Sequence, residues 1–339
     1  MKKTIMLSLV VTSLVMGANT VTNLEINQQN EITSSSTIDN ATVDQGKTEV
    51  LGASIVSDVT IGVTVSGSES KNIIDASSIK MSQTDGSTTT VSQGFLKVDN
   101  SKASQLLLDT RNSILNIDIT NTKIEQGGLT VEGNSEAKDI ETSIPTELDA
   151  TNIISNTSAE SSSVDINGKE IKQAVTVVSG GAVVKKFLLN NKNKIDESTV
   201  NNSEVYQSNL KIDGSGTDVT TLTITLKEAN ANEGNYILNS EISSDSVIKQ
   251  NDITIQNTSV VSTLISKTNN TIDSFKADKS LISQNEMFID NSAVTGFTTT
   301  QTNEIIGTAV NADGTYNSWS NTSSRPENTT ISQGSTTIN

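Results

Sequence analysis

The chain has 339 residues and contains neither cysteine nor histidine. Without cysteine, a disulfide scaffold, a thiolate metal site and a lipid anchor on cysteine are excluded. Without histidine, the common nucleophile–base pairs and imidazole metal sites are excluded as well. We therefore expect no catalytic residue, no cofactor and no metal ion, and catalysis by carboxylates alone is the enzymatic chemistry left open.

Large apolar side chains are scarce. Only 33% of the residues are hydrophobic and 3% are aromatic, which is too little for the cores of ordinary globular domains. Arginine occurs only at Arg111 and Arg325 and the net charge is −16, so we expect no nucleic-acid partner. The mixture of Val, Ile and Leu with Ser, Thr, Asn and Gly favours strands and tight turns. Disorder is the competing interpretation, because polar residues and excess charge are also typical of unfolded chains.

The chain has one long apolar run, at 5–15, which follows two lysines and precedes the small residues Gly17 and Ala18. This pattern predicts a signal peptide over residues 1–18. A buried helix or a membrane anchor is the alternative for this run. No other stretch approaches the roughly 18 apolar residues that a membrane span needs. We expect a secreted protein, extracellular or at the cell surface, with no stable membrane insertion.

A short pattern recurs eight times: Ile or Val, any residue, Gln, and then an apolar residue or Thr five and seven places after the start. The copies start at Val43, Val91, Ile124, Ile171, Val205, Ile248, Ile282 and Ile331. Successive starts are 48, 33, 47, 34, 43, 34 and 49 residues apart, so short and long intervals alternate. This period indicates a repeat architecture in which units of about 80 residues, each with two copies, stack on one another. The predicted organisation is a degenerate N-terminal segment and four repeat units, at 19–42, 43–123, 124–204, 205–281 and 282–339.

Each copy predicts a strand, a corner and a second strand. Side chains alternate along a strand, so positions five and seven join the face of the first residue and the Gln only if the chain bends between them. The residue three places after the start falls at this bend, and it is Gly, Ala, Ser or Asn in every copy. A second corner follows at places eight and nine, as in Glu132-Gly133 and Asp290-Asn291. Gly and Asn tolerate the positive φ of such corners.

Stacked in register, these units predict an all-β fold, a parallel β-solenoid (β-helix) of about eight motif copies with rungs roughly 4.8 Å apart. The recurrent Gln then lies on the inner face, where its amide can hydrogen-bond to the Gln above and below. Alternatively, it lies at the edge of the core and contacts water. The predicted Gln ladder is Gln45, Gln93, Gln126, Gln173, Gln207, Gln250, Gln284 and Gln333. The predicted core ladder is Val50, Val98, Val131, Val178, Ile212, Ile255, Ile289 and Ile338.

The rung length has two interpretations. One copy per rung gives eight long rungs, whereas rungs of roughly 16 residues would make two turns in a short interval and three in a long one. We prefer the first, because the midpoints of the intervals contain no second Gln motif. Two weaker echoes accompany the motif, Asn-x-Ile in the short intervals and Asn-Ile-Ile or Asn-Tyr-Ile in the long ones. They begin at Asn112, Asn193 and Asn270 and at Asn72, Asn152 and Asn235, respectively.

Four of the copies resemble the Ile-x-Gln repeats of curlin, the subunits of curli and related functional amyloids. They are Thr42-Val-Asp-Gln-Gly46, Thr90-Val-Ser-Gln-Gly94, Lys123-Ile-Glu-Gln-Gly127 and Thr330-Ile-Ser-Gln-Gly334. The resemblance covers the motif positions, well under half of the chain; curlin repeats are shorter, and their following Asn, Ala and second Gln are absent here. It implies a secreted β-solenoid that polymerises into extracellular biofilm fibres, with an export pore and a nucleator as partners.

The sequence thus predicts a structural subunit of an extracellular fibre or matrix that joins head to tail with copies of itself. The expected assembly edge is the last motif copy, with Ile331, Gln333 and Ile338, because an open parallel edge is a template for another chain. The main alternative is a monomeric surface adhesin with a solenoid stalk that binds glycan or protein. A β-helical polysaccharide-active enzyme is a remote alternative.

Overall fold

The computed structural model describes residues 10–15, 20–26, 29–39, 42–61, 70–80, 89–108, 110–116, 118–120, 122–142, 152–155, 158–160, 170–189, 192–225, 234–243, 246–277, 281–310, 316–320 and 330–339. Every regular element in these residues is a β-strand. The strands form two large sheets, and within the described ranges they pair in parallel, apart from one antiparallel pair near the C-terminus. The prediction of an all-β fold with parallel sheets is confirmed.

The first sheet, called the motif sheet below, consists of two columns of strands that β4 (Thr42–Leu51) joins by running through both. The first column contains the Ile/Val-x-Gln strands, β7 (Thr90–Gln93), β12 (Lys123–Gln126), β17 (Glu170–Gln173), β23 (Glu204–Gln207), β28 (Val247–Gln250), β31 (Leu281–Gln284) and β36 (Thr330–Gln333). The second column contains β8 (Leu96–Asp99), β13 (Leu129–Glu132), β18 (Thr176–Ser179), β24 (Leu210–Asp213), β29 (Ile253–Gln256), β32 (Met287–Ile289) and β37 (Thr336–Ile338). At the N-terminal edge, β1 (Val10–Val15) pairs with β4.

The second sheet, called the facing sheet, also has two columns. One contains β2 (Thr20–Ile26), β5 (Ile55–Ile61), β9 (Lys102–Leu108), β14 (Glu136–Thr142), β19 (Val183–Val184), β20 (Phe187–Leu189), β25 (Asp218–Thr225) and β33 (Ala293–Val294). The other contains β3 (Gln29–Asp39), β6 (Ser70–Lys80), β10 (Thr110–Leu115), β11 (Asp118–Thr120), β15 (Asn152–Ser155), β16 (Ser158–Glu160), β21 (Asn193–Asp196), β22 (Thr199–Asn201), β26 (Asn235–Leu238) and β27 (Glu241–Ser243). The long strands β30 (Val260–Ala277) and β34 (Phe297–Val310) run through both columns, and β35 (Tyr316–Ser320) is antiparallel to β34.

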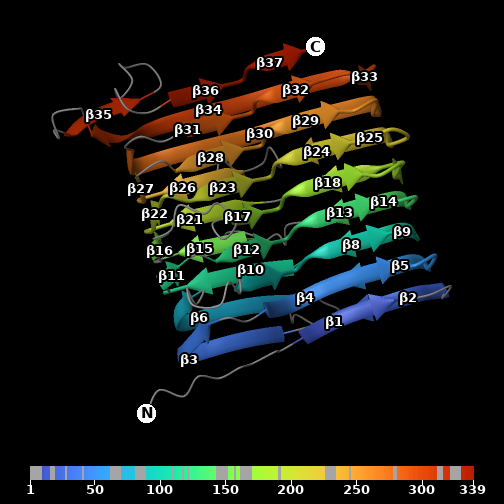
Figure 1. Cartoon of the computed structure of the whole chain (residues 1–339), viewed down its shortest axis with the longest axis horizontal. Helices are drawn as coiled ribbons and strands as arrows, with labels where there is room; N and C mark the ends of the chain where they lie inside the picture. Colours follow the sequence, from blue (N-terminus) through green and yellow to red (C-terminus); the bar gives the residue numbers. More distant parts are fainter. Residues whose placement is uncertain are drawn as a thin grey trace.

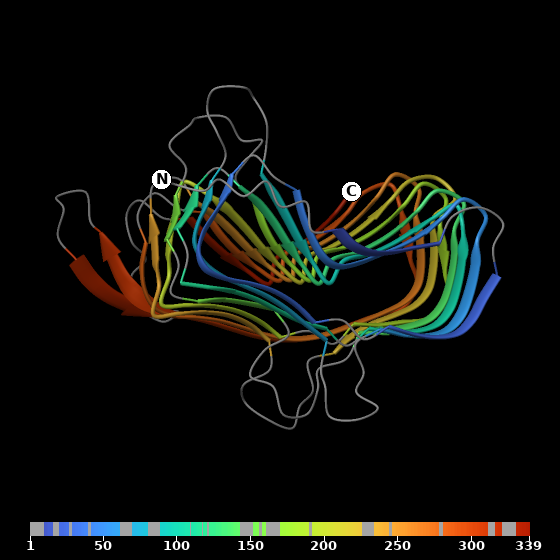
Figure 2. The ribbon, with the colours of Figure 1, turned by 90° about the horizontal axis from the view of Figure 1, so that it is seen from below.

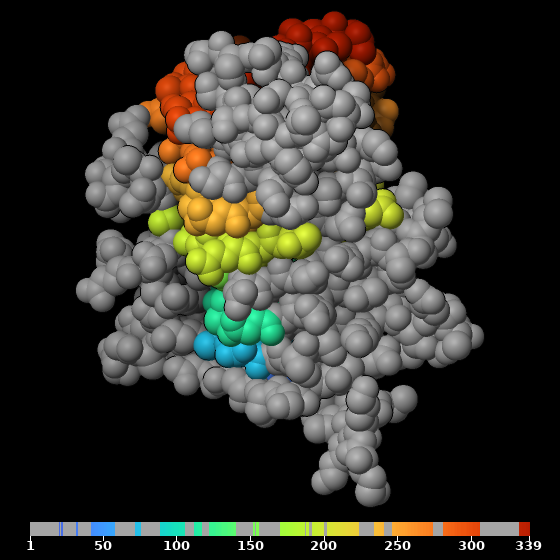
Figure 3. All heavy atoms as spheres, turned by 90° about the vertical axis from the view of Figure 1, so that its left-hand side faces the viewer, coloured from blue at the N-terminus to red at the C-terminus, as the bar shows by residue number. Residues whose placement is uncertain are grey.

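Successive motif copies are direct neighbours in the motif sheet. Val91 pairs with Ile124 and Gln93 with Gln126, and the same register holds along the whole column. Each round of the chain therefore crosses the motif sheet once and the facing sheet once, and such a round is called a pass. Figure 1 shows the passes stacked in sequence order. Among the described strands none stands between two neighbouring copies, which contradicts the alternative of 16-residue rungs. Figure 3 shows the same order as bands on one face, from blue near the N-terminus to red near the C-terminus.

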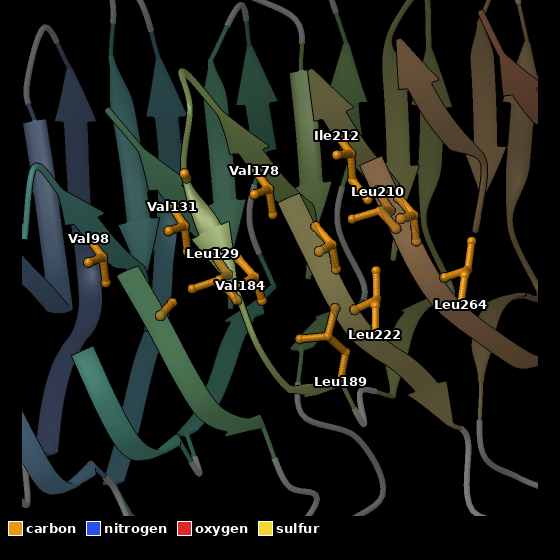
Figure 4. Close-up of a cluster of buried hydrophobic side chains, with 14 of the residues drawn as sticks. Val98, Leu129, Val131, Val178, Val184, Leu189, Leu210, Ile212, Leu222 and Leu264 are labelled. Carbon is orange, nitrogen blue, oxygen red and sulfur yellow. The ribbon is translucent and has the colours of Figure 1, made fainter. Parts of the chain in front are cut away.

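Two separate apolar clusters fill the space between the sheets. One combines positions five and seven of the motif with residues such as Val184, Leu222 and Leu264 of the facing sheet. Figure 4 shows that these side chains recur from pass to pass along the stack. The other cluster combines the first residue of the motif with Ile residues of the facing sheet, such as Ile114 and Ile195. Since each pass supplies similar apolar residues at the same places, each core is a continuous line of contacts.

The N-terminal segments have a place in this arrangement. β1 lies within the predicted signal peptide, while Gly17 and Ala18, where cleavage is expected, lie outside the described residues. β2 and β3 occupy the segment 19–42, and Ile32 of β3 pairs with Ile74 and is buried in the second cluster. In the part of the chain that is described, no helix has the length and apolarity to cross a membrane.

Candidate functional site

The corner of every motif copy has a left-handed backbone. As predicted, the residue three places after the start has a positive φ in all eight copies, between +55° and +67°. The second corner also contains a residue with positive φ, for example Gly133 at +63° and Asn291 at +45°. The first corner bends the motif sheet along its middle, and the end-on view in Figure 2 shows one layer bending toward the other. The bend brings the Gln and positions five and seven to the same inner side.

The eight glutamines form one hydrogen-bonded line. Each Gln donates its Nε2–H to the Oε1 of the Gln in the preceding copy, and the seven N···O distances are 2.7–2.9 Å. From Gln45 to Gln284 the side chains are 0% exposed, whereas Gln333 is exposed. The buried amides therefore find their partners in one another and not in water, as a stacked amide requires.

The same amides also connect the two sheets. Gln93 Nε2 lies 3.0 Å from the carbonyl oxygen of Asn72, and Gln207 Nε2 lies 3.3 Å from that of Tyr236. Gln250 and Gln284 make equivalent contacts with carbonyl oxygens of the facing sheet. In these four glutamines one N–H of the amide points to the preceding Gln and the other to a carbonyl oxygen, which determines the direction of the ladder: donors face the N-terminal end of the stack and acceptors face the C-terminal end.

A second amide ladder belongs to the facing sheet. Each Asn Nδ2 donates to the Oδ1 of the Asn in the next pass, over 2.7–3.0 Å, which is the direction opposite to that of the Gln ladder. The Asn echoes of the short and long intervals thus occupy one line. Its members are Asn72, Asn112, Asn152, Asn193, Asn235, Asn270 and Asn303. Sequence reasoning missed Asn303, although Asn303-Glu-Ile305 has the same Asn-x-Ile spacing.

The Asn ladder packs against the first corner, which explains why small residues recur there. A Cβ atom added at Gly127 would lie 2.8 Å from Asn152 Oδ1. In the pass where the corner residue is Ser208, its Oγ accepts a hydrogen bond from Asn193 Nδ2 and donates one to Asn235 Oδ1, at 2.8 and 2.9 Å. The corner residue must therefore be small, or must itself hydrogen-bond to the ladder.

The residues of the predicted assembly edge lie on the last pass of the motif sheet that is described. Ile331 pairs with Ile282, and Gln333 donates to Gln284 Oε1 at 2.7 Å. Ile338 is 71% exposed, while the other members of the predicted core ladder are 0–7% exposed. Ile338 is thus a correction to that ladder: it has the register position of a core residue, but among the described residues no pass of the facing sheet covers it.

The outer side of the bend forms a groove of about 480 Å³ along the stack. Tyr206 and Phe288 line it together with charged residues that include Asp252, Glu286 and Lys249. Asp252 accepts hydrogen bonds from Ser283 Oγ at 2.7 Å and from the Glu286 N–H at 3.0 Å. Burial raises the pKa of Asp252 from 3.8 to about 6, against the lowering by these hydrogen bonds. Sequence reasoning missed this groove, because its residues vary from copy to copy.

We expect Asp252→Asn to make the protein more stable at neutral pH. Because the pKa is raised, the folded chain binds more protons at Asp252 than the unfolded chain, so the free energy of unfolding falls as pH rises from about 4 to about 6. The amide keeps both contacts without this cost when its Oδ1 accepts from the Glu286 N–H and its Nδ2–H donates to Ser283 Oγ. Urea denaturation should show the variant more stable at pH 7 by on the order of 1–3 kcal/mol and about equal to the wild type at pH 3.5.

Asp213→Asn is the matched control for this prediction. Lys211 lowers the pKa of Asp213, so this carboxylate contributes stability that is present at neutral pH and is lost in acid. Asp213→Asn should therefore leave the protein at pH 7 unchanged or slightly less stable. Equal destabilisation by Asp252→Asn at both pH values would show that its hydrogen bonds matter more than its burial.

The described residues contain no group of three or more acidic, His or Cys side chains that could hold a metal ion. Comparison of the chain with protein-family models, curated proteins and solved structures gave no match.

Proposed function

We propose that the chain is a secreted structural subunit of an extracellular fibre or matrix, folded as a parallel β-solenoid with one motif copy per rung and joined head to tail. The observation that carries this proposal is the uniform contact between passes. Every motif copy meets the next through the same parallel register, the same Gln–Gln hydrogen bond and the same apolar neighbours. Contacts that join one pass to the next within a chain are equally suited to join two chains.

The edges of the motif sheet support this arrangement. β36 and β37 leave one side of their backbone without a neighbouring strand among the described residues, and they carry the exposed Ile338 and Gln333. In the parallel register of the motif sheet, a C-terminal edge pairs with the N-terminal edge of another copy, whereas two C-terminal edges would pair antiparallel and lose that register. Such a contact is heterologous and does not close, and therefore it produces a filament.

The cellular side of the proposal follows from the sequence. The signal peptide at 1–18 directs export, and an export pore and a nucleator are the expected partners of a subunit that must remain unassembled until it is outside the cell. The absence of Cys and His and the excess of acidic residues agree with a structural role and with solubility before assembly.

Negative-stain microscopy, thioflavin binding and fibre diffraction of the protein without its signal peptide test the proposal. We expect unbranched fibres with a strand repeat of about 4.8 Å along the fibre axis. Soluble monomers at high concentration would contradict the proposal and favour the adhesin, in which the groove beside Tyr206 and Phe288 would be the ligand-binding surface. Aromatic rings next to carboxylates and amides are the chemistry that an extended glycan requires.

Ile338→Lys is a sharper test of head-to-tail joining. Ile338 is 71% exposed, so the substitution should change the stability of the single chain by less than about 0.5 kcal/mol. In a fibre the same side chain is buried, where an unpaired ammonium costs several kcal/mol. The elongation rate, measured by thioflavin fluorescence after seeding, should therefore fall at least about 10-fold.

Thr337→Lys is the control. Thr337 is the exposed neighbour of Ile338, and strand alternation turns it to the outer side. The variant has the same added charge on the same strand and should elongate like the wild type. If both lysine variants elongated normally, the edge of β37 would not be part of the joint between subunits.

A further inference from the structure

The described stack ends in half a pass at its C-terminal end, and at its N-terminal end β1 alone lies in the motif half of the first pass. At the C-terminal end, β36 and β37 extend the motif sheet one pass beyond β31 and β32, whereas the described part of the facing sheet has no parallel pass beyond β33 and β34. At the N-terminal end, β2 and β3 extend the facing sheet one pass before β5 and β6. The two halves are therefore complementary: one end supplies the motif half of a pass and the other supplies the facing half. Figure 1 shows these ends at the top and the bottom of the stack.

At the N-terminal end, the place beside β4 is taken by β1, which fits it poorly. Val11 of β1 is paired with Gln45, so a valine stands where every other pass has a glutamine. The register then shifts from Val11↔Gln45 to Thr12↔Lys47, which leaves no residue of β1 opposite the corner residue Gly46. The Gln ladder accordingly stops at Gln45, whose Nε2 lies 3.4 Å from the carbonyl oxygen of Ile73. β1 therefore pairs with the backbone of β4, but it has neither the Gln side chain nor the corner residue that every motif copy provides.

We propose that the joint between two subunits is one pass shared by both, an inference that rests on the fibre proposed above. β36 and β37 of one copy supply its motif half, and β2 and β3 of the next copy supply its facing half. β1 occupies the place of β36 and β37, so the chain accepts another copy only after β1 has left. Removal of the predicted signal peptide, which contains β1, is then the step that opens the joint.

The register of the motif sheet determines the contacts of this shared pass. Gln333 of one copy lies opposite Gln45 of the next, Gly334 opposite Gly46, and Ile338 opposite Val50, because these residues hold the same motif positions. Gln45 then donates to Gln333 Oε1, which continues the ladder in its established direction. Gly334 has a φ of +67° and supplies the corner that β1 lacks.

The facing sheet continues in the same way. Through successive pairings, Asn303 corresponds to Asn30 and Ile305 to Ile32, so both the Asn ladder and the second apolar cluster extend across the joint. Among the described residues, the antiparallel pairing of β35 with β34 covers Ile306–Val310, after the positions of Asn303 and Ile305. The two ladders have opposite directions, so both are continued only when a C-terminal end meets an N-terminal end.

Disulfide trapping tests the shared pass, and the chain has no native cysteine to interfere. The proposal places Thr337 of one copy beside Glu49 of the next, at the neighbouring-strand spacing of about 5 Å that a disulfide spans. A full-length chain with Thr337→Cys, Glu49→Cys and a protease site inserted after Ala18 is folded, cut or left uncut, and then oxidised. We expect a ladder of covalent multimers on a non-reducing gel for the cut chain and at least about 10-fold less for the uncut chain, because β1 blocks the competent state.

Two control variants make the result decisive. Thr337→Cys with Lys97→Cys places the second thiol one pass deeper, about 10 Å away, and should not cross-link. Thr337→Cys alone would form dimers only if two C-terminal ends met. Cross-linking of either control as strong as that of the Glu49 pair would overturn the shared pass, and equal cross-linking of cut and uncut chains would overturn the blocking role of β1. If the cut wild-type chain formed no fibre at all, the proposed function itself would fail.

Discussion

Replacement of Gln207 by Leu will lower the free energy of unfolding by about 3–5 kcal/mol. Gln207 is 0% exposed, donates to Gln173 Oε1 at 2.8 Å and to the carbonyl oxygen of Tyr236, and accepts from Gln250 Nε2 at 2.7 Å. A leucine of similar size fills the space but leaves three buried polar groups without this partner, and each such group costs roughly 1–3 kcal/mol. Chemical denaturation monitored by circular dichroism measures the loss.

Gln333→Leu is the matched control, because it makes the same substitution at the exposed end of the ladder. Gln333 makes one ladder hydrogen bond, to Gln284, and water can replace it. We expect a loss below about 1 kcal/mol in the single chain. If the two variants lost equal stability, or if Gln207→Leu lost less than about 1 kcal/mol, the amide ladder would contribute little to the fold. Loss of fibre growth by Gln333→Leu alone would instead place its role at the joint between subunits.

The motif was sufficient to predict the motif sheet, because each motif residue contacts the same motif position in the neighbouring passes. Ile124 meets Val91 on one side and Ile171 on the other, so the same residue type is favoured in every copy. The corner was predictable for the same reason, since each pass needs a positive φ at the same place. A chemical requirement that recurs in every pass leaves a periodic signal in the sequence.

The facing sheet and the groove left a weaker signal. The segments that lead to the Asn ladder differ in length between short and long intervals, so Asn112 and Asn152 fall at different distances from the motif and read as unrelated echoes. In the groove, Asp252 depends on Ser283 of the following pass, and this pairing does not recur. The arrangement of the two ends of the stack could be identified only from the strand pairing, because no residue type distinguishes β2 and β3 from a repeat.

Gly234→Ala will destabilise the protein by about 4 kcal/mol or more, although Gly234 belongs to no motif. Its φ is +152°, and an added Cβ atom would lie 2.0 Å from the backbone carbonyl oxygen of Asn269. This clash differs from that at Gly127, because the obstructing atom is the backbone of β30 and not the end of a side chain. The shift would separate Asn235 from Asn270, which lie next to the two clashing residues and share a hydrogen bond of 2.8 Å. The midpoint of thermal unfolding is a suitable measurement.

Gly216→Ala separates backbone strain from steric clash. Gly216 also has a positive φ, +81°, but a Cβ atom there would meet nothing closer than Gly181 Cα at 3.6 Å, an ordinary contact. The control therefore has only the strain of a left-handed alanine, about 1–2 kcal/mol. If Gly234→Ala loses more stability than Gly216→Ala, the close approach of neighbouring passes limits the size of the side chains between them. Equal losses of stability would mean that the backbone of β30 moves away from the added Cβ atom. Neighbouring passes would then be packed less rigidly than the unbroken Asn ladder indicates.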